Sequence, residues 1–142
     1  MSQARALCLK QNAKLTAARE AVLKLIWQSH KPAGAYQLIE LLSAEQGRQV
    51  LPPTIYRSLD FLLNLGLIHR IASLNAYVGC PFPGASHNDL FMLCRECGSV
   101  AECSAENIDS AIARTAAKSG FAVETHALEI IGLCPQCQQK DQ

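Results

Sequence analysis

The sequence predicts an α+β protein in which an N-terminal winged helix-turn-helix is followed by a small α/β domain. Apolar residues recur at helical spacing three times in the first half of the chain, and two short apolar runs follow them. A segment rich in proline and glycine, residues 80–87, then interrupts the pattern. Two CxxC pairs lie beyond this segment. We therefore expect domains at residues 1–79 and 88–142, joined by a hinge at residues 80–87.

Three helices are predicted in the N-terminal domain. Thr16 is a suitable N-cap for an amphipathic helix within residues 15–30. A second helix is expected over residues 35–47, where a glycine ends it. The third, over residues 51–66, carries two prolines in its first turn, where a missing N–H is tolerated. Its buried stripe is expected to contain Ile55, Leu59, Leu62 and Leu63.

A hairpin is predicted after the third helix. Residues 67–71 and 76–78 form short apolar runs on either side of a turn that contains Ser73 and Asn75. Three helices followed by a hairpin is the order of a winged helix-turn-helix. The hydrophobic pattern by itself would also suit other small domains.

The C-terminal domain is predicted to mix strands with one helix. Residues 90–94 and 99–103 are expected to form strands on either side of the first CxxC turn. A helix over residues 105–120 and a longer strand over residues 121–134 should follow. That strand leads to the second CxxC pair and a polar tail.

Composition and charge limit the function classes. No apolar run is long enough to span a bilayer, and the first residues lack a signal-peptide pattern, so we expect a cytoplasmic protein. Residues 1–79 contain nine basic and four acidic side chains, whereas residues 80–142 contain four and eight. A basic half is typical of proteins that bind nucleic acid, although solvated charge can also segregate by chance.

The cysteines predict a metal site. Thiols stay reduced in the cytosol and the seven cysteines are an odd number, which disfavours a disulfide framework. One CxxC could be a thiol-redox pair, but two pairs suit tetrahedral Zn²⁺ better. We expect these four ligands to form a closed structural site, and we call them the four-cysteine cluster: Cys94, Cys97, Cys134 and Cys137.

A second zinc site is predicted around the hinge. One thiol, two imidazoles and one carboxylate could converge if the hinge folds back, and together they are donors that zinc prefers. We call this set the hinge site: His69, Cys80, His87 and Glu102. A lone histidine is more often a surface or core residue, and a lone cysteine is often a small buried hydrophobe. Cys8 is expected to pack on an N-terminal helix.

The sequence resembles the ferric uptake regulator family of bacterial metal-sensing repressors and, within it, the zinc uptake regulator branch. The resemblance covers about residues 15–137. It is carried by LTAARE, PPTIYRSLDFLLNLGLIHR, the CREC and CPQC pairs, and HALEIIGLC. It implies an N-terminal winged helix that binds DNA, a C-terminal dimerisation domain that holds the four-cysteine cluster, and a regulatory zinc in the hinge site.

The resemblance also implies further site residues. The third helix would enter the major groove of DNA, and the expected contacts are Lys14, Arg19, Thr54, Tyr56, Arg57 and Arg70. For Arg70, a solvated surface charge is an equal alternative. Some family members carry a third metal site. Its weak counterpart here would contain Asp89, Asp109 and His126, although a packing or hydrogen-bonding role for His126 is the favoured interpretation.

We therefore expect a repressor without enzymatic activity that binds two Zn²⁺ per chain. A homodimer would bind palindromic double-stranded operator DNA when zinc fills the hinge site, and would repress zinc-uptake genes. No membrane and no small-molecule substrate other than zinc are expected as partners. The alternatives are an iron- or peroxide-sensing member of the family and a zinc-stapled protein-interaction module. A zinc hydrolase is disfavoured because four protein ligands leave no open metal position, and no HxE or HExxH motif is present.

Overall fold

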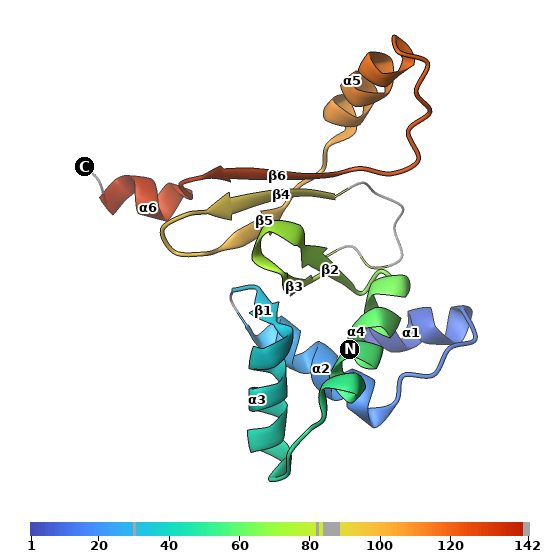
Figure 1. Ribbon diagram of the computed structural model, residues 1–142, viewed down its shortest axis with the longest axis vertical. Helices are drawn as coiled ribbons and strands as arrows, with labels where there is room; N and C mark the ends of the chain where they lie inside the picture. The colour runs from blue at the N-terminus through green and yellow to red at the C-terminus, as the bar shows by residue number, and fades with distance from the viewer. Residues whose placement is uncertain (30, 82, 84–88, 141–142) are drawn as a thin grey trace. The chain divides into compact units, whose positions relative to one another are not determined.

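The computed structural model describes residues 1–29, 31–81, 83 and 89–140 of the chain. The chain divides into two compact units, Met1–Ala85 and Ser86–Gln142. Each unit combines helices with a three-stranded sheet (Figure 1). The α+β fold class predicted from the sequence is confirmed.

Four helices of the first unit precede its hairpin. They are α1 (Ser2–Lys10), α2 (Ala17–Gln28), α3 (Ala35–Gln46) and α4 (Pro52–Asn64). The hydroxyl of Thr16 accepts a hydrogen bond from the Arg19 backbone N–H at 3.3 Å, so the predicted N-cap of α2 is present. Gly47, with φ of 67°, ends α3 in the left-handed conformation that glycine adopts without steric cost. Cys8 is buried on α1, as expected.

The hairpin consists of β2 (Ile68–Ile71) and β3 (Ala76–Gly79), which pair antiparallel through a short 3₁₀ turn at Ala72–Leu74. Asn75 takes a φ of 47° in this turn, a conformation that asparagine tolerates. A two-residue strand, β1 (Ala33–Gly34), pairs with the other edge of β3. The sequence analysis missed β1, because two residues carry no periodicity.

The helices of the first unit share one apolar core. Ile55, Leu59 and Leu62 of α4 are fully buried, whereas Leu63 is only partly buried at the edge of the core; Ser58 is buried as well. The core also takes side chains from α2, α3 and the hairpin, including Val22, Leu23, Ile26, Leu38, Leu42, Leu67, Ile68 and Tyr77. This packing leaves the opposite face of α4 exposed.

The second unit is built on a mixed sheet with the order β5-β4-β6. β4 (Asp89–Cys94) pairs antiparallel with β5 (Val100–Glu102) and parallel with β6 (Ala127–Gly132). A parallel pair needs a crossover connection, and α5 (Glu106–Ala117) supplies it. Figure 1 shows β6 running alongside β4 after the chain returns from α5.

Two predictions for this unit need correction. The last strand begins at Ala127 rather than at residue 121. Residues 121–126 form no regular structure and do not pair with the sheet. No helix was expected at the second CxxC pair or in the polar tail after it, but residues 135–140 form the short helix α6 (Pro135–Lys140), with a proline in its first turn. Within the described residues, no helix is long and apolar enough to cross a membrane.

Candidate metal centre and nucleic-acid interface

The parallel pairing of β4 with β6 assembles the four-cysteine cluster. Cys94 is the last residue of β4 and lies opposite Gly132 at the end of β6. The two CxxC turns therefore leave the sheet at the same end. One sulfur from each of Cys94, Cys97, Cys134 and Cys137 lies within 4.8 Å of every other.

The sulfur geometry fits a tetrahedral metal ion. Cys97 Sγ and Cys134 Sγ lie 3.8 Å apart. Two sulfurs bound tetrahedrally to one zinc at about 2.3 Å lie roughly 3.8 Å apart, whereas a disulfide would require about 2 Å. All seven cysteines fall in the described part of the chain, and none forms a disulfide. The cluster therefore fits zinc.

Hydrogen bonds and mutual proximity perturb the thiols of the cluster. Backbone N–H groups, chiefly that of Cys134, which donates to Cys94 Sγ at 3.4 Å, lower the pKa of Cys94 to about 6. The adjacent Cys134 thiol, together with burial, raises the pKa of Cys137 to about 12. Four thiolates at this spacing repel one another, so full ionisation needs a cation between them. Bound Zn²⁺ would supply that charge and close the site with four protein ligands.

Two residues predicted for the hinge site lie together in the first unit. His69 is in β2, and Cys80 directly follows β3. A ring nitrogen of His69 and the Cys80 sulfur lie within 4.8 Å of each other. Glu102 ends β5 in the second unit. His87 lies outside the described residues, as does most of the expected hinge at residues 80–87, and the four-residue ligand set stays a prediction.

The weak third site is brought together only in part. Nε2 of His126 lies 2.7 Å from Oδ1 of Asp109, and both side chains are at most one-third exposed. Asp109 belongs to α5, and His126 directly precedes β6. The side chain of Asp89 is outside the described part of the structure. The contact that is present is the polar pairing favoured for His126.

The exposed face of α4 carries the side chains expected to contact DNA. Thr54, Tyr56 and Arg57 all lie in the first two turns of the helix, and all three are exposed. Arg70 is exposed on the hairpin, where its guanidinium donates to the Asn75 side-chain oxygen at 2.9 and 3.2 Å. These positions suit a helix in the major groove with a wing beside it.

Arg19 has a structural environment that the sequence did not reveal. Its guanidinium carbon lies 3.7 Å from the centre of the Phe61 ring, an arrangement typical of a cation–π contact. The same group donates to the Lys14 carbonyl at 2.7 Å. Arg19 thus links α2 to α4 and to the segment before α2. Its expected phosphate contact stays a prediction.

Comparison with known proteins places the chain in a family. A profile of the ferric uptake regulator family matches residues 10–131. The chain belongs to the ferric uptake regulator family. The match includes all of α2, α3, α4 and the hairpin and most of the second unit. It ends before Cys134 and Cys137, so this half of the four-cysteine cluster is supported by the structure.

Several relatives of this ferric uptake regulator family member are named as regulators of zinc uptake. The zinc uptake regulation protein of Escherichia coli K12 is 39% identical over 138 residues, covering 96% of this chain and 80% of that protein. A solved zinc uptake regulator complexed with zinc and DNA has a TM-score of 0.92 and 37% identity, covering 99% of this chain and 93% of its own. The solved structure of holo XcZur has a TM-score of 0.87 and 34% identity, and the match covers 97% of this chain and 96% of the XcZur chain.

Proposed function

We propose that this member of the ferric uptake regulator family is a zinc-responsive transcriptional repressor. A homodimer would bind palindromic operator DNA when zinc fills the hinge site, and would thereby repress zinc-uptake genes. The observation that carries this proposal is the match over 99% of the chain to a zinc uptake regulator solved with zinc and DNA. Such a protein works on chromosomal DNA, so the proposed location is the cytoplasm.

The donor chemistry of the chain supports zinc as the signal. Cys80 adds a soft thiolate to the imidazole of His69, and zinc accepts this combination readily. The stretch before the first CxxC, residues 86–93, contains a single histidine, whereas the family resemblance implies a histidine-rich stretch there for an iron or peroxide sensor. The residues therefore favour zinc over the iron- or peroxide-sensing alternative. Two zinc ions per chain are proposed, one in the four-cysteine cluster and one in the hinge site.

The exposed face of α4 supports DNA as the partner. Arg57 presents a guanidinium that matches the O6/N7 edge of guanine, and the first 79 residues have a net positive charge. In the second unit, Met92 of β4 and Ile130 of β6 are register partners on one face of the sheet, and they are 47% and 46% exposed. Apolar side chains exposed this close together are typical of a protein–protein contact, which supports the proposed dimer. A two-fold dimer presents two α4 helices, so its operator should be roughly palindromic.

Regulation would follow from thermodynamic linkage. The proposed ligands come from both units, so binding of zinc would restrict how the units are oriented. If the restricted arrangement matches operator half-sites better than the free one, zinc strengthens DNA binding, and operator DNA strengthens zinc binding by the same factor.

Zinc counting provides the test. The parent protein should hold one chelator-resistant zinc and one exchangeable zinc per chain, and Cys80→Ala should remove only the exchangeable ion. Operator affinity of the parent should fall when free zinc is buffered away while the four-cysteine zinc is retained. Cys103→Ala is the matched control, because Cys103 belongs to neither proposed ligand set. A single tight zinc in both the parent and Cys80→Ala would refute the zinc-sensor function.

The same assays separate the remaining class of function. A zinc-stapled protein-interaction module would not depend on the α4 face, and its activity would survive Arg57→Ala. A repressor should instead lose operator affinity in this variant without a change in its zinc content.

A further inference from the structure

Trp27 is the single tryptophan of the chain, and its ring lies against the end of a strand. It belongs to the last turn of α2 and is 51% exposed. A Cβ added to Gly79, the last residue of β3, would lie 2.4 Å from Cε2, 2.7 Å from Cδ2 and 2.8 Å from Cζ2 of this indole. Carbon atoms in contact normally lie about 3.5–4.0 Å apart. The ring therefore occupies the place where any other side chain at position 79 would begin.

The backbone does not explain the glycine at this position. Gly47, Gly66, Gly98 and Gly120 have positive φ angles, and Gly79 is not among these residues. An alanine could therefore adopt the Gly79 backbone conformation without strain. Contact with the indole is the feature of the structure that requires a glycine here.

The contact lies next to Cys80. Gly79 directly precedes Cys80 and pairs with Ile68 of β2, and the Cys80 backbone N–H donates to the Leu67 carbonyl at 3.0 Å. Cys80 is fully buried. The backbone next to this thiol is thus paired with β2 at Gly79 and is in contact with the Trp27 ring at the same residue.

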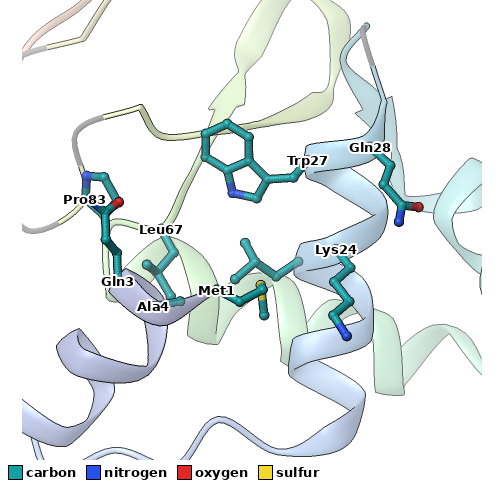
Figure 2. A pocket seen from close by; sticks show the side chains of 9 residues that line it. Met1, Gln3, Ala4, Lys24, Trp27, Gln28, Leu67 and Pro83 are labelled. Atoms are coloured by element: carbon teal, nitrogen blue, oxygen red, sulfur yellow. The ribbon is translucent and has the colours of Figure 1, made fainter.

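A cavity of about 320 Å³ adjoins the ring. Leu67, whose carbonyl accepts from the Cys80 N–H, lines it together with Pro83 and Trp27 (Figure 2). Figure 2 shows the indole extending from α2 toward the strands of the hairpin. The Trp27 ring therefore borders space into which it can move when the backbone at Gly79 and Cys80 shifts.

We propose that Trp27 is a positioning residue for Cys80 and that its contact with Gly79 couples α2 to zinc binding in the hinge site. The inference rests on the proposed function, because it requires Cys80 to bind the exchangeable zinc. Seated on Gly79, the indole fixes the end of β3 and so restricts where the Cys80 sulfur lies relative to His69. Leu23 and Ile26 of α2 share a core with α4, so a shift at the end of β3 reaches the helix that faces DNA.

The test is a double-mutant cycle on the full-length dimer with the four-cysteine zinc retained. The affinity for the exchangeable zinc is measured by competition with a chromophoric chelator. In Gly79→Ala the new Cβ forces the ring or the strand to move, so this affinity should fall by about tenfold or more. In Trp27→Ala the ring is gone, and adding Gly79→Ala should change the affinity by less than about twofold.

Gly34→Ala is the matched control for the cycle. Gly34 lies in the same sheet, and a Cβ there would meet only the Asn75 carbonyl oxygen at an ordinary 3.9 Å. Its zinc affinity should equal that of the parent. Thermal unfolding of each variant separates a local effect on zinc from a general loss of stability. The proposal is overturned if Gly79→Ala lowers zinc affinity equally with and without Trp27, or not at all.

Tryptophan fluorescence gives a second measurement that needs no glycine variant. Emission from Trp27 should change as the exchangeable zinc binds the parent protein and should not change in Cys80→Ala. Zinc uptake by the parent without any change in emission would contradict the inference and leave the zinc-sensor function intact. If the parent takes up no exchangeable zinc, the zinc-sensor function itself fails.

Discussion

Loss of the metal from the four-cysteine cluster should unfold the second unit and leave the first unit folded. The perturbation is Cys137→Ser, which removes a ligand whose side chain is buried. Among the described residues of this unit, the large side chains that are buried are Leu90, Phe91 and Leu93. Each contributes about 1.5–3 kcal/mol, so together they contribute at most about 9 kcal/mol. A structural zinc contributes about 10–16 kcal/mol, which exceeds the contribution of this small core.

Hydrogen exchange measured by mass spectrometry would locate the effect. In Cys137→Ser, amides of β4 and β6 should exchange as fast as in an unfolded peptide. Amides of α2, α3 and α4 should keep the protection of the parent, because their core does not include the cluster. The parent treated with a chelator strong enough to remove all zinc should give the same pattern.

Cys103→Ser is the matched control for this prediction. Cys103 lies in the same unit, is partly exposed and stands outside the four-cysteine cluster. Its substitution should leave both the zinc content and the exchange pattern unchanged. If β4 and β6 keep their protection in a protein that metal analysis shows to be free of zinc, then the unit folds on its own core and the reasoning is wrong.

Three further predictions concern the first unit. Leu38 is 0% exposed, so Leu38→Ala should lower the free energy of unfolding, measured in urea, by about 2–5 kcal/mol. Leu41 lies on the same helix but is 42% exposed, so Leu41→Ala should lower it by less than about 1 kcal/mol. Arg57→Ala should weaken operator binding by roughly 5–150-fold, corresponding to about 1–3 kcal/mol, in fluorescence anisotropy; unchanged affinity would remove Arg57 from the DNA contacts. The hydrogen bond from Arg5, 2.7 Å long, holds the pKa of Glu20 below its ordinary value of 4.5. The α1–α2 contact should therefore be fully stabilising above pH 4.5 and should weaken as the pH falls through the lowered pKa of Glu20. An NMR titration of the Glu20 carboxyl checks this, and Glu20→Gln should abolish the pH dependence of the contact.

Much of the first unit could be predicted because local signals and tertiary packing agree there. Thr16 caps α2, Gly47 ends α3 and Asn75 turns the hairpin, each for a reason carried by that residue alone. The apolar period of α4 also identified its buried face. Ser58 could not be predicted in the core, because a polar residue on that face gives no apolar signal.

The errors in the second unit arose where a local pattern had two physical explanations. Phe121 and Val123 alternate with Ala122 and Glu124, which resembles a strand, but the two larger side chains line an apolar pocket with Ile108 and Ile112 of α5. The spacing of the cysteines predicted one cluster. The parallel register that brings the two pairs together is a property of the folded sheet and could not be read from spacing.

Contacts set by packing angles were invisible in the sequence. Arg19 was expected to be a phosphate contact, and nothing local indicated that its guanidinium would stack on Phe61. The contact between Trp27 and Gly79 joins residues more than fifty positions apart. Both depend on how a helix meets its neighbour, which one-dimensional periodicity does not contain.

Protein synthesis separates the two halves of the four-cysteine cluster in time. Cys134 follows Cys97 by 37 residues. At roughly 5–20 residues per second, a ribosome needs about two to seven seconds for that interval. During this time Cys94 and Cys97 emerge without their partner thiols, and β4 has no β6 to pair with, whereas the whole first unit has already been made. A newly made chain therefore contains the whole first unit before its four cysteines can come together around one metal ion.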